Sequence, residues 1–202
     1  DLHSFPTRRS SDLWQKTERL RLRQWTEADY PPFAEMNADP EVMRFFPAPL
    51  SRTESDAMAN RCRILIDERG WGFWAVERRG TGTFIGLVGL HVPDVALPFS
   101  PCVEIGWRLA RPHWGKGYAT EAARAALQVA FETLGLGEVV SFTALPNLRS
   151  QAVMRRIGMN RSPANFEHPL VPCGSPLRPH CLYRLSQEEW RDASAKDRKS
   201  VV

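Results

Sequence analysis

Apolar and polar residues alternate along several short stretches of the chain. In residues 17–25, Leu20 and Leu22 alternate with arginines, and this period of two predicts a half-buried strand. Further strands are predicted at residues 71–77, 83–91, 102–109, 138–144 and 180–185. A glycine-containing turn at 78–82 joins two of these strands into a hairpin.

Helical patterns lie between the strands. Thr26 as N-cap and Asp29 at the capping-box position predict a helix that residues 38–40 end, and Gly70 stops a second helix. The later helices are expected at 52–68, 119–134, 147–157 and, briefly, from Ser186. The apolar positions of the helix at 52–68 are Ala57, Cys62, Ile64, Leu65 and Ile66. The order β–α–α–β–β–β–α–β–α–β indicates a mixed α/β (α+β) fold.

Composition narrows the class of protein. The chain has 202 residues, 43% hydrophobic and 25% charged, so we expect one globular domain with a substantial core. The net charge of +4 suits an anionic ligand, but the arginines are spread along the chain, which argues against a nucleic-acid partner. No apolar run approaches the ~20 residues of a membrane span, and the N-terminus has no apolar signal segment. We therefore expect a cytoplasmic protein without a membrane partner.

The cysteines carry no metal signature. They contain no CxxC pair, so we expect no metal ion and reduced thiols in the cytosol. The four cysteines are Cys62, Cys102, Cys173 and Cys181.

Both ends of the chain look foreign to the domain. Residues 3–13 resemble the translation of a short-read sequencing adapter, and residues 197–202 resemble its complementary strand. We interpret 1–13 and 197–202 as non-native tails and 14–196 as the domain. The alternative is a genuine disordered tail rich in serine and arginine.

A glycine turn between a strand and a helix is the central chemical signal. Gly115 and Gly117 allow close approach of an anion and positive φ, and Lys116 adds charge. The N-terminus of the helix that follows presents free N–H groups at its positive end, which predicts a phosphate site. The turn fits neither the P-loop pattern nor GxGxxG, so by itself it also fits a plain tight connection.

From residue 103 to 130 the chain resembles the acetyl-CoA-binding motif of the GNAT superfamily of N-acetyltransferases, R/Q-x-x-G-x-G/A. Gly117 and Ala119 fill the small positions, and Trp114 replaces the usual Arg or Gln, as in the RimJ/RimL-like branch with its W-G-x-G-Y-A-T-E-A pattern. The resemblance extends over about 170 residues, through TERLRLRQWTEAD at 17–29, NADPEV at 37–42 and NLRS at 147–150. It implies the GNAT fold, a mixed central sheet with splayed strands and flanking helices.

The resemblance implies a set of acetyl-CoA contacts. The pyrophosphate would rest on backbone N–H groups of the glycine turn, and the pantetheine arm would pair with the strand backbone before it. A backbone N–H at or near Leu109 would polarise the thioester. The expected contacts are Trp107, Leu109, Arg111, Trp114, Gly115, Lys116, Gly117, Tyr118, Ala119, Thr120 and Asn147. Asn147 has an alternative role as N-cap of its helix.

Acetyl transfer to an amine also needs a base and an acid. Glu104, in the otherwise apolar strand CVEIGWRL, is the candidate base, because partial burial would raise its pKa. Solvent exposure or pairing with an arginine is the alternative for Glu104, and the rival bases are His91, His168 and His180. Resemblance suggests Ser150 as the acid, with water as an alternative. Tyr118 fits packing or a cofactor contact better than an acid.

The acceptor is left open between a protein N-terminal amine and a small-molecule amine. The aromatic residues Phe45, Phe46, Trp71, Phe73 and Trp74 either line the acceptor pocket or belong to the core. Residues 165–180 form a lid or a dimer arm, and the protein is a monomer or homodimer. The competing functions are a non-catalytic acyl-CoA sensor and a basic RNA- or ribosome-binding protein.

Overall fold

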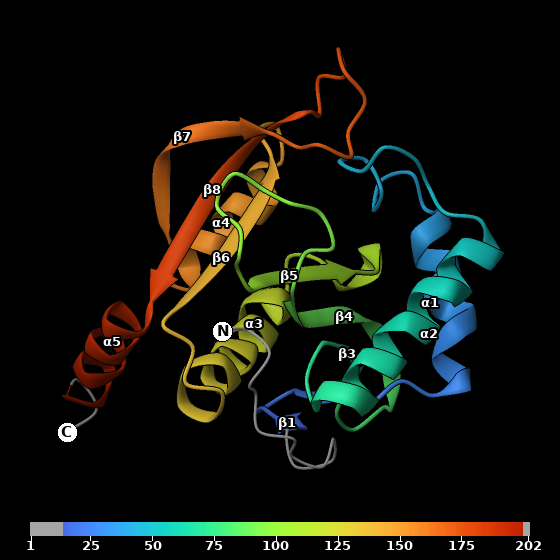
Figure 1. Cartoon of the computed structure of the whole chain (residues 1–202). Helices are drawn as coiled ribbons and strands as arrows, with labels where there is room; N and C mark the ends of the chain where they lie inside the picture. Colours follow the sequence, from blue (N-terminus) through green and yellow to red (C-terminus); the bar gives the residue numbers. More distant parts are fainter. Residues whose placement is uncertain (1–13, 200–202) are drawn as a thin grey trace.

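One mixed sheet runs through the computed structural model, which describes residues 14–199 (Figure 1). In that part of the chain the sheet has eight strands in the order β1-β2-β3-β4-β5-β6-β8-β7. The strands are β1 Gln15–Lys16, β2 Leu20–Arg23, β3 Phe73–Arg78, β4 Thr83–His91, β5 Glu104–Leu109, β6 Glu138–Ala144, β7 Asn160–Glu167 and β8 Pro179–Ser186. All neighbours pair antiparallel except β5 and β6, which are parallel.

Helices cover both faces of the sheet (Figure 1). They are α1 Tyr30–Ala38, α2 Arg52–Arg69, α3 Tyr118–Gln128, α4 Leu148–Arg156 and α5 Gln187–Lys199. Because side chains alternate along a strand, Leu20 and Leu22 of β2 are buried on the face covered by α3. On the opposite face, α1 and α2 pack together and contact β4 and β3. No helix among residues 14–199 is long and apolar enough to cross a membrane.

The alternation and capping signals in the sequence are confirmed. The Thr26 amide donates to the Asp29 carboxylate at 2.8 Å in a 3-10 turn, Glu27–Asp29, that leads into α1. Ser51 caps α2, and Gly70 ends it with a left-handed φ of 82°. The hairpin turn lies between β3 and β4 as predicted.

Several details of the sequence prediction are wrong. Ala57 and Ile64 face solvent, because α2 buries Ser55 and Ala59 with Cys62 and Ile66. The third helix changes at Val129–Thr133 into a π-helical turn. β1 and β7 were not predicted, and the strand expected at 102–109 begins at Glu104. The segment 1–13, interpreted as foreign, lies outside the described residues, whereas the α5 backbone runs to Lys199 within the other suspect segment.

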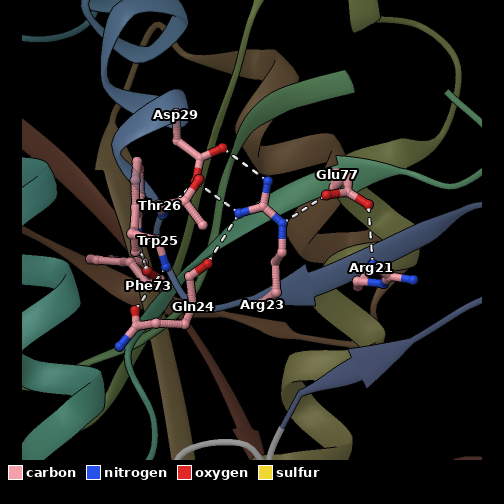
Figure 2. Close-up of polar contacts among 8 residues, drawn as sticks. All are labelled: Arg21, Arg23, Gln24, Trp25, Thr26, Asp29, Phe73 and Glu77. Carbon is pink, nitrogen blue, oxygen red and sulfur yellow. Dashed lines mark hydrogen bonds and ion pairs between the residues drawn. The ribbon is translucent and has the colours of Figure 1, made fainter. Parts of the chain in front are cut away.

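A partly buried ionic network ties β2 to β3 and to the 3-10 turn before α1 (Figure 2). Arg23 bonds both Asp29 carboxylate oxygens, at 2.7 and 2.9 Å, and its Nε donates to Glu77 at 2.7 Å. Asp29 is only 2% exposed. The hydrogen bonds that Arg23 donates to Asp29 outweigh burial and, with the bond to Glu77, raise the pKa of Arg23. Beside this network the Trp25 indole donates to the Phe73 carbonyl at 2.8 Å, which positions the start of β3.

We predict that Arg23→Gln lowers the free energy of unfolding by about 3 kcal/mol, because it leaves the buried Asp29 charge without its partner. Denaturant unfolding measures this change. Arg52→Gln is the matched control, since Arg52 pairs with Asp56 at 2.9 Å on an exposed helix surface and should contribute less than about 0.5 kcal/mol. Equal losses in the two variants would contradict the assigned role of the network.

Candidate functional site

β5 and β6 pair at one position and then separate. Glu104 faces Val140, and the Ser141 hydroxyl donates to the Ile105 carbonyl at 2.9 Å. Beyond this point the strands diverge around a cleft of about 2260 Å³. Since Ala110 donates its amide to Ile85 of β4, the strand alternation points the N–H groups of Trp107 and Leu109 away from β4 and into the cleft.

Three side-chain contacts link β5, the turn that follows it and α4 around the cleft. The Trp107 indole donates to the Ser150 hydroxyl of α4 at 3.1 Å. The Trp114 indole donates to the Leu109 carbonyl at 2.7 Å, and the Arg149 guanidinium lies 4.8 Å from the Trp114 ring centroid. The β5 branch and α4 are therefore joined across the cleft by side chains, while the β5 amides stay open.

The glycine turn leads from β5 into the N-terminus of α3. Gly115 and Gly117 both have left-handed φ, 71° and 78°, and Gly117 is the N-cap of α3. A Cβ at Gly115 would meet no atom within 4 Å. The first helical bond runs from Glu121 to Gly117, so amides 118–120 have no acceptor within the helix. The turn therefore offers unused donors beside open space, as an anion requires.

A polar brace that the sequence did not reveal fixes this turn. Arg19 donates to the Lys116 carbonyl at 2.9 Å and forms an ion pair with Glu121 at 2.6 Å. Burial alone would raise the pKa of Glu121, but hydrogen bonds from Thr17 and Arg19 outweigh it and lower the pKa. The Tyr118 ring packs under the Arg19 guanidinium at 4.7 Å, so it has a packing role.

Two of the residues predicted to bind the cofactor lie apart from the cleft lining. The strand ends at Leu109 as predicted. Arg111, an expected cofactor contact, begins the 3-10 turn Arg111–His113, and its side chain pairs with Asp39 at 3.4 Å. Lys116 turns its ammonium to the Pro112 carbonyl at 2.8 Å. The other predicted contacts line the cleft: Trp107, Leu109, Trp114, Gly115, Gly117, Tyr118, Ala119, Thr120 and Asn147.

Asn147 and Ser150 lie at the start of α4, on the far wall of the cleft. Asn147 caps the helix by accepting from the Ser150 amide at 3.2 Å, and it donates to Thr143 at 2.9 Å. The capping role considered for Asn147 is therefore present. Ser150 accepts the Trp107 indole, which leaves its own hydroxyl hydrogen available to a ligand.

Alternate residues of β5 form a row on the face opposite α3: Glu104, Gly106 and Arg108. The Glu104 carboxylate has no hydrogen bond or ion pair with any residue in 14–199, so the alternative of an arginine partner is wrong. Burial, with a smaller contribution from Asp94, raises its pKa to about 8. His91 lies opposite Glu104 on β4 and stacks on Phe73 with ring centroids 5.4 Å apart.

The other two rival bases, His168 and His180, lie across the cleft on the β6–β8 side. His168 and His180 have ring centroids 4.8 Å apart, and Phe142 and Phe166 pack beside them. Burial and the neighbouring His180 lower the pKa of His168 to about 4, so this imidazole is a weak base. The histidines therefore form an uncharged aromatic wall at neutral pH.

The aromatic set divides between core and cleft. Trp71 and Trp74 are 1% and 0% exposed and belong to the core. Phe45, Phe46 and Phe73 line the cleft. Among residues 14–199, no group of three or more His, Cys, Asp or Glu side chains is placed to hold a metal ion.

A sheet that opens between two parallel strands above a helix N-terminus defines a site for an extended anionic ligand, and comparison with known proteins gives its family. Residues 19–160 match the model of the acetyltransferase (GNAT) domain. The chain is 34% identical over 149 residues to the uncharacterized protein YkkB of Bacillus subtilis, covering 72% of this chain and 84% of that protein. It is 32% identical over 162 residues to FsC-acetyl coenzyme A-N(2)-transacetylase of Aspergillus fumigatus, covering 77% and 68%.

Solved structures of acetyltransferases also resemble this chain. An acetyltransferase from Agrobacterium tumefaciens shares 32% identity with a TM-score of 0.68, over 85% of this chain and 93% of that one. A GNAT-family acetyltransferase from Bacillus anthracis shares 25% identity with a TM-score of 0.72, over 87% and 99%. The chain belongs to the GNAT family and is an acyl-CoA-dependent acetyltransferase, which confirms the family and the fold predicted from sequence.

The raised pKa of Glu104 predicts a pH-dependent stability. Between its ordinary pKa of 4.5 and the folded value of about 8, the unfolded chain has released the proton while the folded chain keeps it. The free energy of unfolding therefore falls as pH rises through this window and levels off above it. We expect Glu104→Gln to remove roughly 2–4 kcal/mol of this decline between pH 5 and 8, measured by denaturant unfolding.

Glu138→Gln is the control, because it removes one carboxylate on an exposed surface where Glu138 pairs with Arg184. Parallel pH curves for wild type and Glu104→Gln would show that Glu104 is not held protonated by the fold.

Proposed function

We propose that this chain transfers an acetyl group from acetyl-CoA to a primary amine by direct attack in a ternary complex. The observation that carries the proposal is the open edge of β5, which leads through the 3-10 turn Arg111–His113 into the glycine turn. An extended ligand with amide groups can pair with the edge while its phosphates rest at the start of α3. Acetyl-CoA has this combination of parts.

The glycine turn would hold the pyrophosphate. The amides from Gly115 to Ala119 lie at the positive end of the α3 dipole, and the left-handed glycines leave room beside them. The Arg19–Glu121 brace keeps the turn in this shape before the ligand arrives.

The open β5 backbone would orient the pantetheine arm and the thioester. Because the arm enters from the glycine turn, it would meet Leu109 first and Trp107 next. The Leu109 N–H would therefore pair with the arm, and the Trp107 N–H would polarise the thioester carbonyl. Asn147 keeps a second amide hydrogen beyond its bond to Thr143 and could donate it to a pantetheine carbonyl.

Glu104 is the base that the geometry supports best. Its pKa near 8 is close to neutral pH, which favours taking a proton from the ammonium, directly or through a water. Ser150 has a free hydroxyl hydrogen beside the β5 edge, so it could protonate the departing thiolate, with water as the alternative acid.

The proposed acceptor is a primary amine, as the RimJ/RimL-like resemblance implies. Two relatives suggest the two alternatives, a protein amine and a small-molecule amine. A putative ribosomal N-acetyltransferase, YdaF of Bacillus subtilis, is 38% identical over 77 residues. The Aspergillus relative is named for an N(2) acetylation. We propose a primary amine on either a protein N-terminus or a small molecule.

The full chain should release free CoA thiol from acetyl-CoA in the presence of a panel of amines and N-terminal peptides. We predict that Gly117→Glu raises the Kd of acetyl-CoA at least ~100-fold, because it adds left-handed strain and a negative charge where the phosphates would bind. Gly80→Glu is the matched control, since Gly80 has a φ of 85°, no neighbouring atom within 4 Å, and lies in the β3–β4 turn.

Glu104→Gln should keep acetyl-CoA affinity and lose about 10²–10⁴-fold in kcat. If wild type binds acetyl-CoA but transfers nothing to any amine, the chain is a sensor and the proposal fails. If acetyl-CoA does not bind, the site itself is misassigned.

A further inference from the structure

Arg108 is a cation in the cleft without an acidic partner. Its Nη1 donates to the Asn37 side-chain carbonyl at 2.7 Å and lies 3.8 Å from the Met58 sulfur, and its guanidinium stacks on Phe46 at 4.2 Å. None of these neighbours is charged. Its Nε is buried and forms no hydrogen bond with residues 14–199, and burial lowers the pKa of Arg108 to about 10.

Arg23 is half-buried like Arg108, but its charge is compensated within the fold. Arg23 is bound by two carboxylates, Asp29 and Glu77, which compensate the loss of water around its charge. Burying a cation without such compensation costs stability unless a ligand supplies the missing anion. The contrast within one sheet indicates that the partner of Arg108 arrives from outside the chain.

The position of Arg108 relates it to the proposed reaction. It lies on the same face of β5 as Glu104, and Gly106 between them has no side chain. The Phe73 ring covers Gly106, since a Cβ there would be 3.1 Å from it, and the ring lines the cleft between Glu104 and Arg108. An amine bound at Glu104 would lie up to about 14 Å along the strand from Arg108, since the two residues are four apart and a strand rises about 3.4 Å per residue.

Resting on the proposed function, we infer that Arg108 binds a carboxylate of the amine acceptor, and that the acceptor separates this carboxylate from its amine by several bonds. A free α-amino acid places the two groups too close together to reach both Glu104 and Arg108. An ω-amino acid fits, and so does a peptide N-terminus with an acidic side chain a few residues along. The cleft-lining Phe46 and Met58 would cover the bound carboxylate.

Paired acceptors test this inference on the full chain. One pair is 6-aminohexanoate and 6-aminohexanamide. The other is an amidated peptide with glutamate at its third position and the same peptide with glutamine. Wild type should prefer the acid in each responsive pair by about 10- to 100-fold in kcat/KM, mainly through KM. The pair that responds identifies a small molecule or a peptide as the source.

Arg108→Gln should reduce the ratio of kcat/KM for acid over amide to near one. Arg108→Lys should give an intermediate ratio, because it keeps the charge but loses the planar guanidinium that binds both carboxylate oxygens. Arg52→Gln, on the exposed start of α2, should leave the ratio at its wild-type value. A merely structural Arg108, holding α1 and α2 to β5, would lower activity on acid and amide alike. An unchanged ratio in Arg108→Gln, or a wild-type ratio near one in both pairs, overturns the inference.

Failure of the proposed function is distinguishable from failure of the inference. If no amine is acetylated, binding of 6-acetamidohexanoate and 6-acetamidohexanamide is compared by the shift in Tm. The acid should raise the Tm of wild type more than that of Arg108→Gln or Arg108→Lys, whereas the amide should not distinguish them. Equal shifts by acid and amide in wild type would refute the carboxylate site.

Discussion

The structure depends on one constraint, that two neighbouring parallel strands pair at a single position. The β5–β6 ladder consists of Glu104 opposite Val140, and just beyond it the Ser141 hydroxyl takes the Ile105 carbonyl that a further ladder bond would use. Trp107 and Trp114 then place indole donors along the diverging branch, so its carbonyl at Leu109 is satisfied while its amides remain open. An unpaired strand edge inside a protein is costly unless a ligand completes it. The cleft, the glycine turn and the proposed cosubstrate all follow from this opening.

On the side proposed for the amine acceptor, two ionisable side chains lack partners of opposite charge. On the side proposed for acetyl-CoA, backbone amides lack acceptors. Beside β2 and β3, Arg23 pairs with Asp29 and Glu77, and these ion pairs stabilise the fold. In the row on β5, Glu104 and Arg108 have no opposite charge beside them. Groups held in this way cluster where a protein meets a ligand, because the ligand completes what folding leaves unpaired. Burial acts differently on the two ends of the row. It raises the pKa of Glu104 to about 8, whereas Arg108, with a pKa of about 10, stays charged at neutral pH.

Local patterns in the sequence were sufficient to predict the strands and helices around the site. The alternation of Leu20 and Leu22 predicted β2, and the glycine turn predicted the start of α3. β7 was not predicted because most of its residues are exposed and Pro163 interrupts it. Its sequence therefore shows no alternation of apolar and polar residues. Arg19 and Glu121 are 102 residues apart, and Asn37 and Arg108 are 71 apart. Contacts of this kind depend on strand register and helix placement, which a single sequence does not reveal.

The most direct test of the open edge is amide hydrogen exchange at β5, followed residue by residue with and without saturating acetyl-CoA. The account predicts that acetyl-CoA slows exchange at Trp107 and Leu109 at least ~10-fold, because the ligand would supply the acceptors that the edge lacks. Ala110, whose amide already bonds Ile85, is the internal reference and should change little. Unchanged exchange at Trp107 and Leu109 under saturating acetyl-CoA would contradict the claim that the splayed strand receives the cosubstrate.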